Sequence, residues 1–359
     1  DLTGKSGGNA RFHGGDEVLL QGFHWNSIRM SPNGQWYNKL NTMTDQAGNN
    51  IKDLGVTSIW MPPPWRDWSY HASSGFGGEG YFWHDWNLNS QYGTAAQLQT
   101  TAAKLLSNGI KPIYDIVPNH RAYNQPNTEN KYTYPGPKWR NGGADEGNPF
   151  ITGDADLNTG NSLVWTDINN ALLTLKNSYS AQGFRFDFVH GYSTSSTNSW
   201  MQNSIDNGLC VGEYWLHPDT QTQLKTWSNG ANCTVFDFAL KAEFKTGEVR
   251  NFVKALNANP STDWRERAVT FVDNHDTGYS PGQNSGQHHY PTPDAIRDKA
   301  YAYILTSPGT PSVYWPDVFD WGRYDFIKTL IAVRKDAKVY AYSDIKFCIN
   351  SSDVGSGQL

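Results

Sequence analysis

The chain lacks any run of about eighteen or more apolar residues, the minimum for a helix that crosses a bilayer. It also lacks an initial Met and a basic-then-apolar leader before Asp1. Such a start is typical of a secreted protein after removal of its signal peptide. We therefore expect an extracellular protein with no membrane partner.

Charged residues are few, and acidic residues slightly outnumber basic ones. Charged residues make up 18% of the 359 residues, the formal net charge is -5, and no charge blocks, repeats or low-complexity tracts occur. This balance argues against a nucleic-acid partner, while 37% apolar content argues against disorder. HExxH is absent and His288 and His289 are adjacent, so the spacing of a zinc hydrolase is missing. We expect a monomer.

Cysteine is nearly absent, with only Cys210, Cys233 and Cys348. An odd count permits one bridge, and Cys210 with Cys233 is the favoured pair because each lies at the edge of a predicted strand. Three buried free thiols in a cytosolic protein are the alternative.

Aromatic residues, by contrast, are abundant. They form 14% of the chain, with 15 Trp and 19 Tyr, and many stand beside Gly, Pro or Asn, where loops are expected. Flat rings in loops suit sugars, whose C–H faces pack on them. The alternative is that large aromatics merely fill irregular space.

Short β-branched or aromatic runs alternate with helical periods, the pattern of parallel strands with crossover helices. The predicted strands are Val18–Phe23, Thr57–Met61, Lys111–Val117, Gly183–Phe188, Leu209–Gly212, Thr234–Phe238, Ala268–Val272 and Ser312–Trp315. The predicted helices include Ala95–Ser107, Leu163–Tyr179, Gly247–Leu256, Pro293–Leu305 and Asp325–Arg334. Eight such units predict an α/β fold, a (β/α)8 TIM barrel.

A long polar segment, residues 119–161, follows the third predicted strand and shows little periodicity. A loop of this length inside a compact domain is usually functional, and here it stands over the rim where barrel active sites are built. We predict a catalytic barrel from residues 1–118 and 162–335 with an inserted loop domain at 119–161. Residues 336–359 are then a remnant or the start of a C-terminal β-domain that is either truncated or lost.

Four predicted strand ends carry polar residues that an apolar strand has no packing reason to contain. These motifs are DIVPNH from Asp115, GFRFDFVHG from Gly183, GEYW from Gly212 and FVDNHD from Phe271. In FRFDF the alternation of a strand places Arg185 and Asp187 on one face. The four motifs therefore converge on one rim of the barrel.

Two carboxylates about 5 to 5.5 Å apart suit retaining cleavage of a glycosidic bond. Asp187 and Glu213 are the candidate pair, with Arg185 holding Asp187 ionised as nucleophile. Glu213, beside Tyr214 and Trp215, is expected to have a raised pKa and to act as acid and then base. A third carboxylate, Asp276, is expected to bind ring hydroxyls with His120 and His275 in the transition state.

In this order and spacing the four motifs resemble the signature regions of the α-amylase family of glycoside hydrolases. The resemblance spans nearly the whole chain. Within the family the sequence is similar to bacterial maltotetraose-forming exo-amylases. That narrower likeness rests on HGGDE from His13, LQGFHWN from Leu20, PWRDW from Pro64, GEGYFWHD from Gly78, GDADLNTG from Gly153 and FVDNHDTGYSPGQ from Phe271.

The resemblance implies roles for individual residues. Asp187 is the nucleophile, Glu213 the acid/base and Asp276 the stabiliser of the transition state. The cleavage subsite is lined by Tyr81, His120, Arg185 and His275, and Trp25 and Trp65 stack on sugar rings toward the non-reducing end. Asp154 matches the Asp that grips the terminal non-reducing glucose, although a loop or cap residue explains it equally well.

The resemblance also implies calcium. Asn119, Asp156 and the carbonyl of Gly191 match the structural site between the inserted loop and the barrel, and all are hard oxygen ligands. A second, N-terminal site is expected from the residues that match the extra calcium site of the maltotetraose-forming group. These residues are Asp1, His13, Asp16 and Glu17. A solvated acidic turn at residues 14–17 is the alternative.

The expected activity is retaining hydrolysis of α-1,4-glucosidic bonds in starch and maltooligosaccharides. Exo action from non-reducing ends, releasing short products such as maltotetraose, is the favoured mode. An endo-acting α-amylase and a transglycosylase use the same three carboxylates, and water exclusion distinguishes the latter. A non-catalytic carbohydrate-binding member of the fold is the remote alternative, because fold alone does not establish activity.

Overall fold

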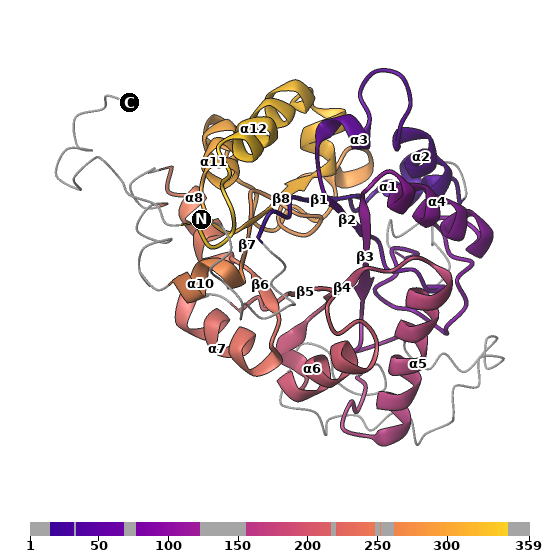
Figure 1. The fold of residues 1–359 in the computed structure, drawn as a ribbon. Coiled ribbons are helices and arrows are strands. Elements are labelled where there is room, and N and C mark those ends of the chain that lie inside the picture. Colours follow the sequence, from indigo (N-terminus) through magenta and orange to yellow (C-terminus); the bar gives the residue numbers. More distant parts are fainter. Residues whose placement is uncertain are drawn as a thin grey trace.

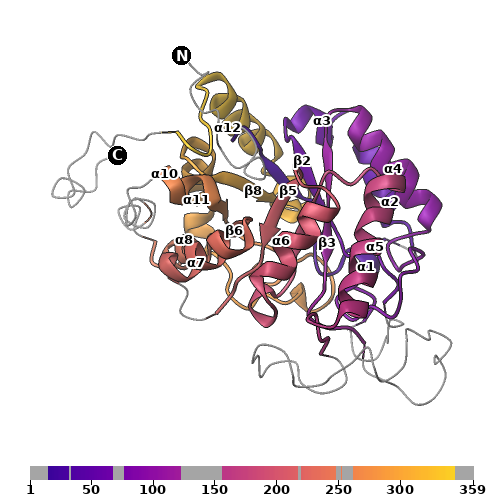
Figure 2. The ribbon, with the colours of Figure 1, turned by 60° about the horizontal axis from the view of Figure 1, so that its bottom comes forward.

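The structure is a computed structural model, and it confirms the predicted barrel. It describes residues 15–31, 34–67, 77–122, 156–216, 220–247, 252 and 262–343. Eight parallel strands close into a barrel in chain order, with the last strand pairing with the first. The strands form the inner ring and the helices lie outside it (Figure 1), and Figure 2 shows the same arrangement from a second direction.

The strands lie where the sequence pattern predicts them, and most are shorter at one or both ends. They are β1 (Leu19–Gln21), β2 (Ser58–Met61), β3 (Lys111–Ile116), β4 (Gly183–Phe186), β5 (Leu209–Gly212), β6 (Thr234–Phe236), β7 (Ala268–Phe271) and β8 (Thr310–Tyr314). The predicted ends Phe188 and Phe238 fall outside the ladder. Phe188 adopts a left-handed conformation with φ 49°, and Phe238 begins a helix.

The helices pack around this ring. They are α1 (Ser27–Met30), α2 (Trp36–Met43), α3 (Ile51–Leu54), α4 (Ala95–Ser107), α5 (Ser162–Ser178), α6 (Thr194–Asn203), α7 (Gln221–Ala231), α8 (Phe238–Phe244), α10 (Thr262–Arg267), α11 (Asp294–Thr306) and α12 (Tyr324–Asp336). None of the described helices has the length and apolar character needed to cross a membrane. Helix α4 begins at a capping box in which Thr94 and Gln97 satisfy each other's backbone N–H groups.

Parts of three predictions lie outside the described residues. They are most of the predicted helix Gly247–Leu256, most of the predicted loop domain at 119–161 and most of the predicted region 336–359. The domain boundaries therefore stay predictions.

Much of the aromatic surplus is in the core rather than in loops. Among the described residues, six tryptophans are fully buried: Trp36, Trp60, Trp83, Trp200, Trp264 and Trp315. Buried indole N–H groups usually find an acceptor. Trp36 donates to the carbonyl of Gly22 at 3.0 Å and Trp83 to that of Val117 at 2.8 Å. For these residues the space-filling interpretation is correct.

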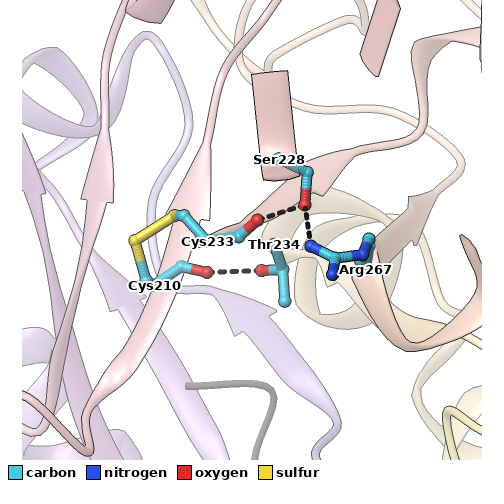
Figure 3. The surroundings of a disulfide bond; sticks show 5 residues. All are labelled: Cys210, Ser228, Cys233, Thr234 and Arg267. Carbon is cyan, nitrogen blue, oxygen red and sulfur yellow. Dashed lines mark hydrogen bonds between the residues drawn. A yellow bond between two sulfur atoms is a disulfide. The ribbon is translucent and has the colours of Figure 1, made fainter. Parts of the chain in front are cut away.

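The predicted disulfide is present. Cys210 in β5 and Cys233 just before β6 are joined with an S–S distance of 2.04 Å (Figure 3). The hydroxyl of Thr234 donates to the carbonyl of Cys210, and the hydroxyl of Ser228 donates to that of Cys233. The bridge therefore joins β5 to the start of β6, the two neighbouring strands that precede and follow helix α7 in the chain.

We expect the double variant Cys210→Ala/Cys233→Ala to unfold with a free energy lower by about 3 kcal/mol, because the bridge closes a loop between residues 23 positions apart. Equilibrium denaturation of both proteins measures the difference. A reductant should destabilise the wild type and leave the double variant unchanged. Labelling of either cysteine by a thiol reagent in the folded, unreduced wild type would contradict the bridge.

Candidate active site

One guanidinium organises the rim of the barrel. Arg185 of β4, whose side chain is fully buried, places Nη1 2.8 Å from Oδ1 of Asp115 and 2.6 Å from Oδ1 of Asp187. Its Nη2 lies 3.1 Å from Oε2 of Glu213 in an ion-pair contact. Asp115 and Arg185 are direct partners in the parallel ladder of β3 and β4, so the pairing register brings them together. The prediction that Arg185 and Asp187 share one face is confirmed.

The two candidate catalytic residues, Asp187 and Glu213, each directly follow the last residue of adjacent strands, β4 and β5. The N–H of Asp187 donates to the carbonyl of Ile116 at 2.8 Å, and that of Glu213 donates to the carbonyl of Phe186 at 2.9 Å. Each residue thus continues its strand by one ladder bond. Phe188 then turns, and its N–H donates to Oε2 of Glu213 at 3.1 Å. The carboxyl groups of Asp187 and Glu213 consequently both reach the guanidinium of Arg185, one at each terminal nitrogen.

The third carboxylate stands beside a histidine on the β7 side of the rim. Oδ2 of Asp276 is 3.1 Å from Nε2 of His275, and its side chain is 18% exposed, against 9% for Asp187 and 7% for Glu213. Nδ1 of His275 is 2.9 Å from the amide nitrogen of Gln21 in β1. Of the three candidate catalytic carboxylates, Asp276 is therefore the most accessible to a ligand.

Burial governs the acidity of this cluster. It raises the pKa of Glu213 to about 7 and that of Asp187 to about 6, while the charge of Arg185 opposes both shifts. As expected, the charge of Arg185 favours the ionised form of Asp187, although loss of solvent outweighs it and leaves the pKa above its usual value. The pKa of Glu213 remains above that of Asp187, as predicted for a general acid and a nucleophile. Burial also raises the pKa of Asp276 well above its usual range.

Three predicted substrate-binding residues form one stack. The rings of Tyr81 and His275 are 5.1 Å apart and nearly parallel, and Trp25 is stacked with them at 6.0 and 6.1 Å. The hydroxyl of Tyr81 donates to Oδ2 of Asp115 at 2.8 Å. This bond connects the stack to the Arg185 cluster, defined here as Arg185 with Asp115, Asp187 and Glu213. The structure thus brings these three residues to the carboxylates, and their sugar contacts stay predictions.

The other predicted substrate contacts are buried or lie beyond the described chain. Trp65 is 2% exposed and packs on Trp83 and Trp86, so the described structure presents little of its ring. His120 is buried against Phe82, and burial lowers its pKa to about 4, which keeps the ring neutral. Asp154 lies outside the described residues.

Three functional positions were not predicted. Asp115 accepts from Trp60 Nε1 at 3.0 Å as well as from Tyr81 and Arg185, and the Arg185 guanidinium lies 4.9 Å from the Trp60 ring centroid. Asp115 stands in the quoted motif DIVPNH, and a carboxylate inside an apolar strand was the available signal. Gln21, a polar residue in an apolar strand, stands in the quoted motif LQGFHWN and gave the same kind of signal. Trp60 carries no such signal, because its role arises from contacts with distant strands.

The predicted calcium ligands Asn119, Asp156 and Gly191 converge. The N–H of Leu157 donates to the carbonyl of Asn119 at 2.9 Å, and Asp156 forms an isolated bridge with His120. Oδ1 of Asn119 is buried and makes no hydrogen bond within the described part of the chain. A Cβ at Gly191 would lie 1.9 Å from that oxygen. The glycine therefore leaves room for an oxygen that lacks a partner, which fits a hard cation.

The predicted N-terminal ligands are only partly described. Asp1 and His13 lie outside the described residues. Glu17 is buried, 2.5 Å from Nζ of Lys111, and accepts from the hydroxyl of Thr57 at 2.5 Å. Asp16 is exposed. The second calcium site stays a prediction, and Glu17, one of its predicted ligands, already forms an ion pair with Lys111.

Comparisons with known proteins agree with this geometry. Residues 39–142 match the family described as alpha amylase, catalytic domain, and residues 319–356 match glucan 1,4-alpha-maltotetraohydrolase, domain C. A glucan 1,4-alpha-maltotetraohydrolase of Stutzerimonas stutzeri is 50% identical over 97% of this chain and 67% of its own length. One of Roseateles saccharophilus is 48% identical over 97% and 66%. The chain thus spans about two thirds of the length of these relatives.

A probable alpha-amylase 2 of Arabidopsis thaliana is 30% identical over 92% of this chain and 83% of its own length. Among solved structures, an Anoxybacillus alpha-amylase covers 93% of this chain and 82% of its own, with a TM-score of 0.70 and 18% identity. That likeness concerns the fold, whereas the sequence relatives share half or nearly a third of their residues with the chain. The chain belongs to the α-amylase family of glycoside hydrolases.

Proposed function

We propose that the chain hydrolyses α-1,4-glucosidic bonds of starch and maltooligosaccharides with retention of configuration. The observation that carries this proposal is the Arg185 cluster, in which one buried guanidinium contacts Asp187 and Glu213 at adjacent strand ends. Close spacing of two carboxyl groups favours the double displacement of retaining enzymes over inversion. We also propose that the enzyme is a monomer.

In this mechanism Asp187 attacks the anomeric carbon while Glu213 donates its proton to the leaving oxygen. Water then enters, Glu213 removes its proton, and the bond from Asp187 to the sugar breaks. The pKa order supports these roles, because at neutral pH Asp187 is mostly ionised while Glu213 retains a proton in a large fraction of molecules. Asp276, the most exposed of the three carboxylates, binds ring hydroxyls and strengthens these contacts as the transition state forms.

We further propose exo action from non-reducing ends with maltotetraose as a main product. Support comes from the two relatives named maltotetraohydrolases at 50% and 48% identity. We also propose that the protein is extracellular, since the disulfide between Cys210 and Cys233 is favoured in oxidising compartments.

The test is the product profile on soluble starch and on maltooligosaccharides blocked at the non-reducing end. Maltotetraose from open chains, no cleavage of blocked chains and α-configured fresh product are the expected results. A broad ladder from both substrates would replace exo with endo action. Products longer than the substrate would indicate transglycosylation, and β-configured product would overturn retention.

We propose that Asn119, Asp156 and the carbonyl of Gly191 hold a calcium ion. The support is the buried, unpartnered Oδ1 of Asn119 facing a glycine that no other residue can replace without a clash. Bound there, the ion would join the start of the inserted segment to the loop after β4. Its contribution would be to stability and to the shape of the rim.

Removing calcium with a chelator is expected to lower the free energy of unfolding by about 3 kcal/mol when the ion was present at about 100 times its Kd. Thermal unfolding with and without chelator measures this change. Asp156→Asn should reduce the difference between the two conditions, whereas the exposed control Asp336→Asn should keep it. An unchanged melting temperature of the wild type in chelator would refute the site.

A further inference from the structure

Behind the turn that carries His275 and Asp276 lies a buried charged quartet, defined here as Lys241, Asp273, Arg297 and Asp317. Lys241 Nζ is 2.7 Å from Oδ1 of Asp273, and Arg297 Nη1 is 2.8 Å from its Oδ2. Arg297 Nη1 also lies 3.2 Å from Oδ2 of Asp317. All four side chains are at most 2% exposed. The quartet is balanced, with two cations facing two carboxylates.

Asp273 contacts the catalytic turn directly. The hydroxyl of Thr277 donates to Oδ1 of Asp273 at 2.9 Å and accepts from the N–H of Asn274 at 3.1 Å. Oδ1 of Asn274 in turn accepts from the N–H groups of Asp276 and Thr277 at 3.0 and 2.8 Å. A continuous set of hydrogen bonds therefore runs from the quartet to the backbone of Asp276.

The same carboxylate is fixed from the opposite side. The N–H of Thr292 donates to Oδ2 of Asp273 at 3.1 Å, and Lys241 Nζ donates to the hydroxyl of Thr292 at 2.7 Å. That hydroxyl donates to the carbonyl of Val272 at 2.8 Å. Asp273 is thus held by α8, by α11 and by the segment before α11, and it has little freedom to move.

Stability alone does not account for such a network. Burying charged groups costs solvation, and well-packed apolar residues of similar volume often stabilise a protein as much or more. What fixed ion pairs do provide is a defined geometry for the segment they contact. Here that segment is the turn between Asn274 and Thr277, whose side chains and backbone set the direction of Asp276.

We propose that Asp273 is a positioning residue for the cleavage step, which it serves by holding, through Thr277, the turn that presents His275 and Asp276 to the substrate. This inference rests on the proposed function. Asp273 does not touch the substrate in this mechanism. Its effect passes through the hydroxyl of Thr277 and the side chain of Asn274.

The most direct test is Thr277→Val, which keeps the side-chain shape and removes the hydroxyl between Asp273 and the turn. Turnover of maltooligosaccharides at 25 °C should fall about 10- to 100-fold in kcat, with KM changed about twofold or less, because a small misplacement of a catalytic group costs rate rather than binding. Asp273→Asn should give the same split. Circular dichroism verifies that both variants are folded at the assay temperature.

Asp317→Asn is the matched control. It removes the other carboxylate of the quartet, which accepts from Arg297 and from the hydroxyl of Tyr301 at 2.6 Å but does not contact the turn. It should lower the melting temperature as Asp273→Asn does and leave kcat within about twofold of wild type. A loss of kcat in Asp317→Asn equal to that in Asp273→Asn would overturn the inference, because the effect would then follow from stability.

A second comparison uses the double variant Lys241→Met/Asp273→Asn, which restores charge balance. Its melting temperature should recover toward wild type while kcat stays low. Recovery of both would overturn positioning by Asp273. The wild type and Asp276→Asn separate this inference from the proposed function. An inactive wild type refutes the function, whereas an active wild type, an inactive Asp276→Asn and a fully active Thr277→Val refute only the inference.

Discussion

Asp187→Asn is expected to lower kcat on maltooligosaccharides by about 10⁴-fold or more while oligosaccharide binding persists. An amide has no charge with which to attack the anomeric carbon, so no covalent intermediate forms. The fold should survive, because Arg185 keeps its contacts with Asp115 and Glu213. Reducing-sugar release measures turnover, and isothermal titration measures binding.

The control for this variant is Asp336→Asn, which neutralises an exposed carboxylate at the end of α12. Its kcat should equal that of the wild type. If Asp187→Asn turned over at a rate within about tenfold of the wild type, Asp187 would not be the nucleophile. If it bound no oligosaccharide, the loss of activity would reflect a collapsed site instead of missing chemistry.

Glu213→Gln is expected to lower kcat on maltooligosaccharides by about 10²- to 10⁴-fold, the usual contribution of a general acid. The loss of bond cleavage should be much smaller for an aryl maltooligosaccharide, because an acidic phenol leaves without receiving a proton. Glu243→Gln, a half-buried position on α8, is the matched control and should keep full activity on both substrates.

The same variant tests the pKa assignments. In the wild type kcat/KM should fall below pH about 6 as Asp187 gains a proton, and fall above pH about 7 as Glu213 loses one. Because the two groups interact, the observed values belong to the pair. Glu213→Gln should abolish the alkaline limb on the aryl substrate and keep the acid limb. If the Glu213→Gln profile still fell above pH about 7, a group other than Glu213 would cause the alkaline limb.

Most of the barrel was predictable because its signals are local. Helix α4 occupies the predicted residues Ala95–Ser107, since its apolar period and its Thr94–Gln97 capping box lie within one stretch of chain. Strand β5 likewise occupies the predicted Leu209–Gly212. Helix α6 was missed because Ser, Thr and Asn dominate it, and it forms by burying Trp200 and Met201 against the barrel.

The sequence by itself determined the order of the elements, the motif residues at their ends and the cysteine pair, because strand alternation and helical periods depend only on neighbouring residues. Only the tertiary structure decided which distant groups meet. Gln21 reaches His275 across 254 positions, and Asp273 meets Lys241 and Arg297 behind the catalytic turn. Burial was decided at the same level. The pKa of Asp187 is raised despite Arg185, because exclusion of water depends on every element packed around the site.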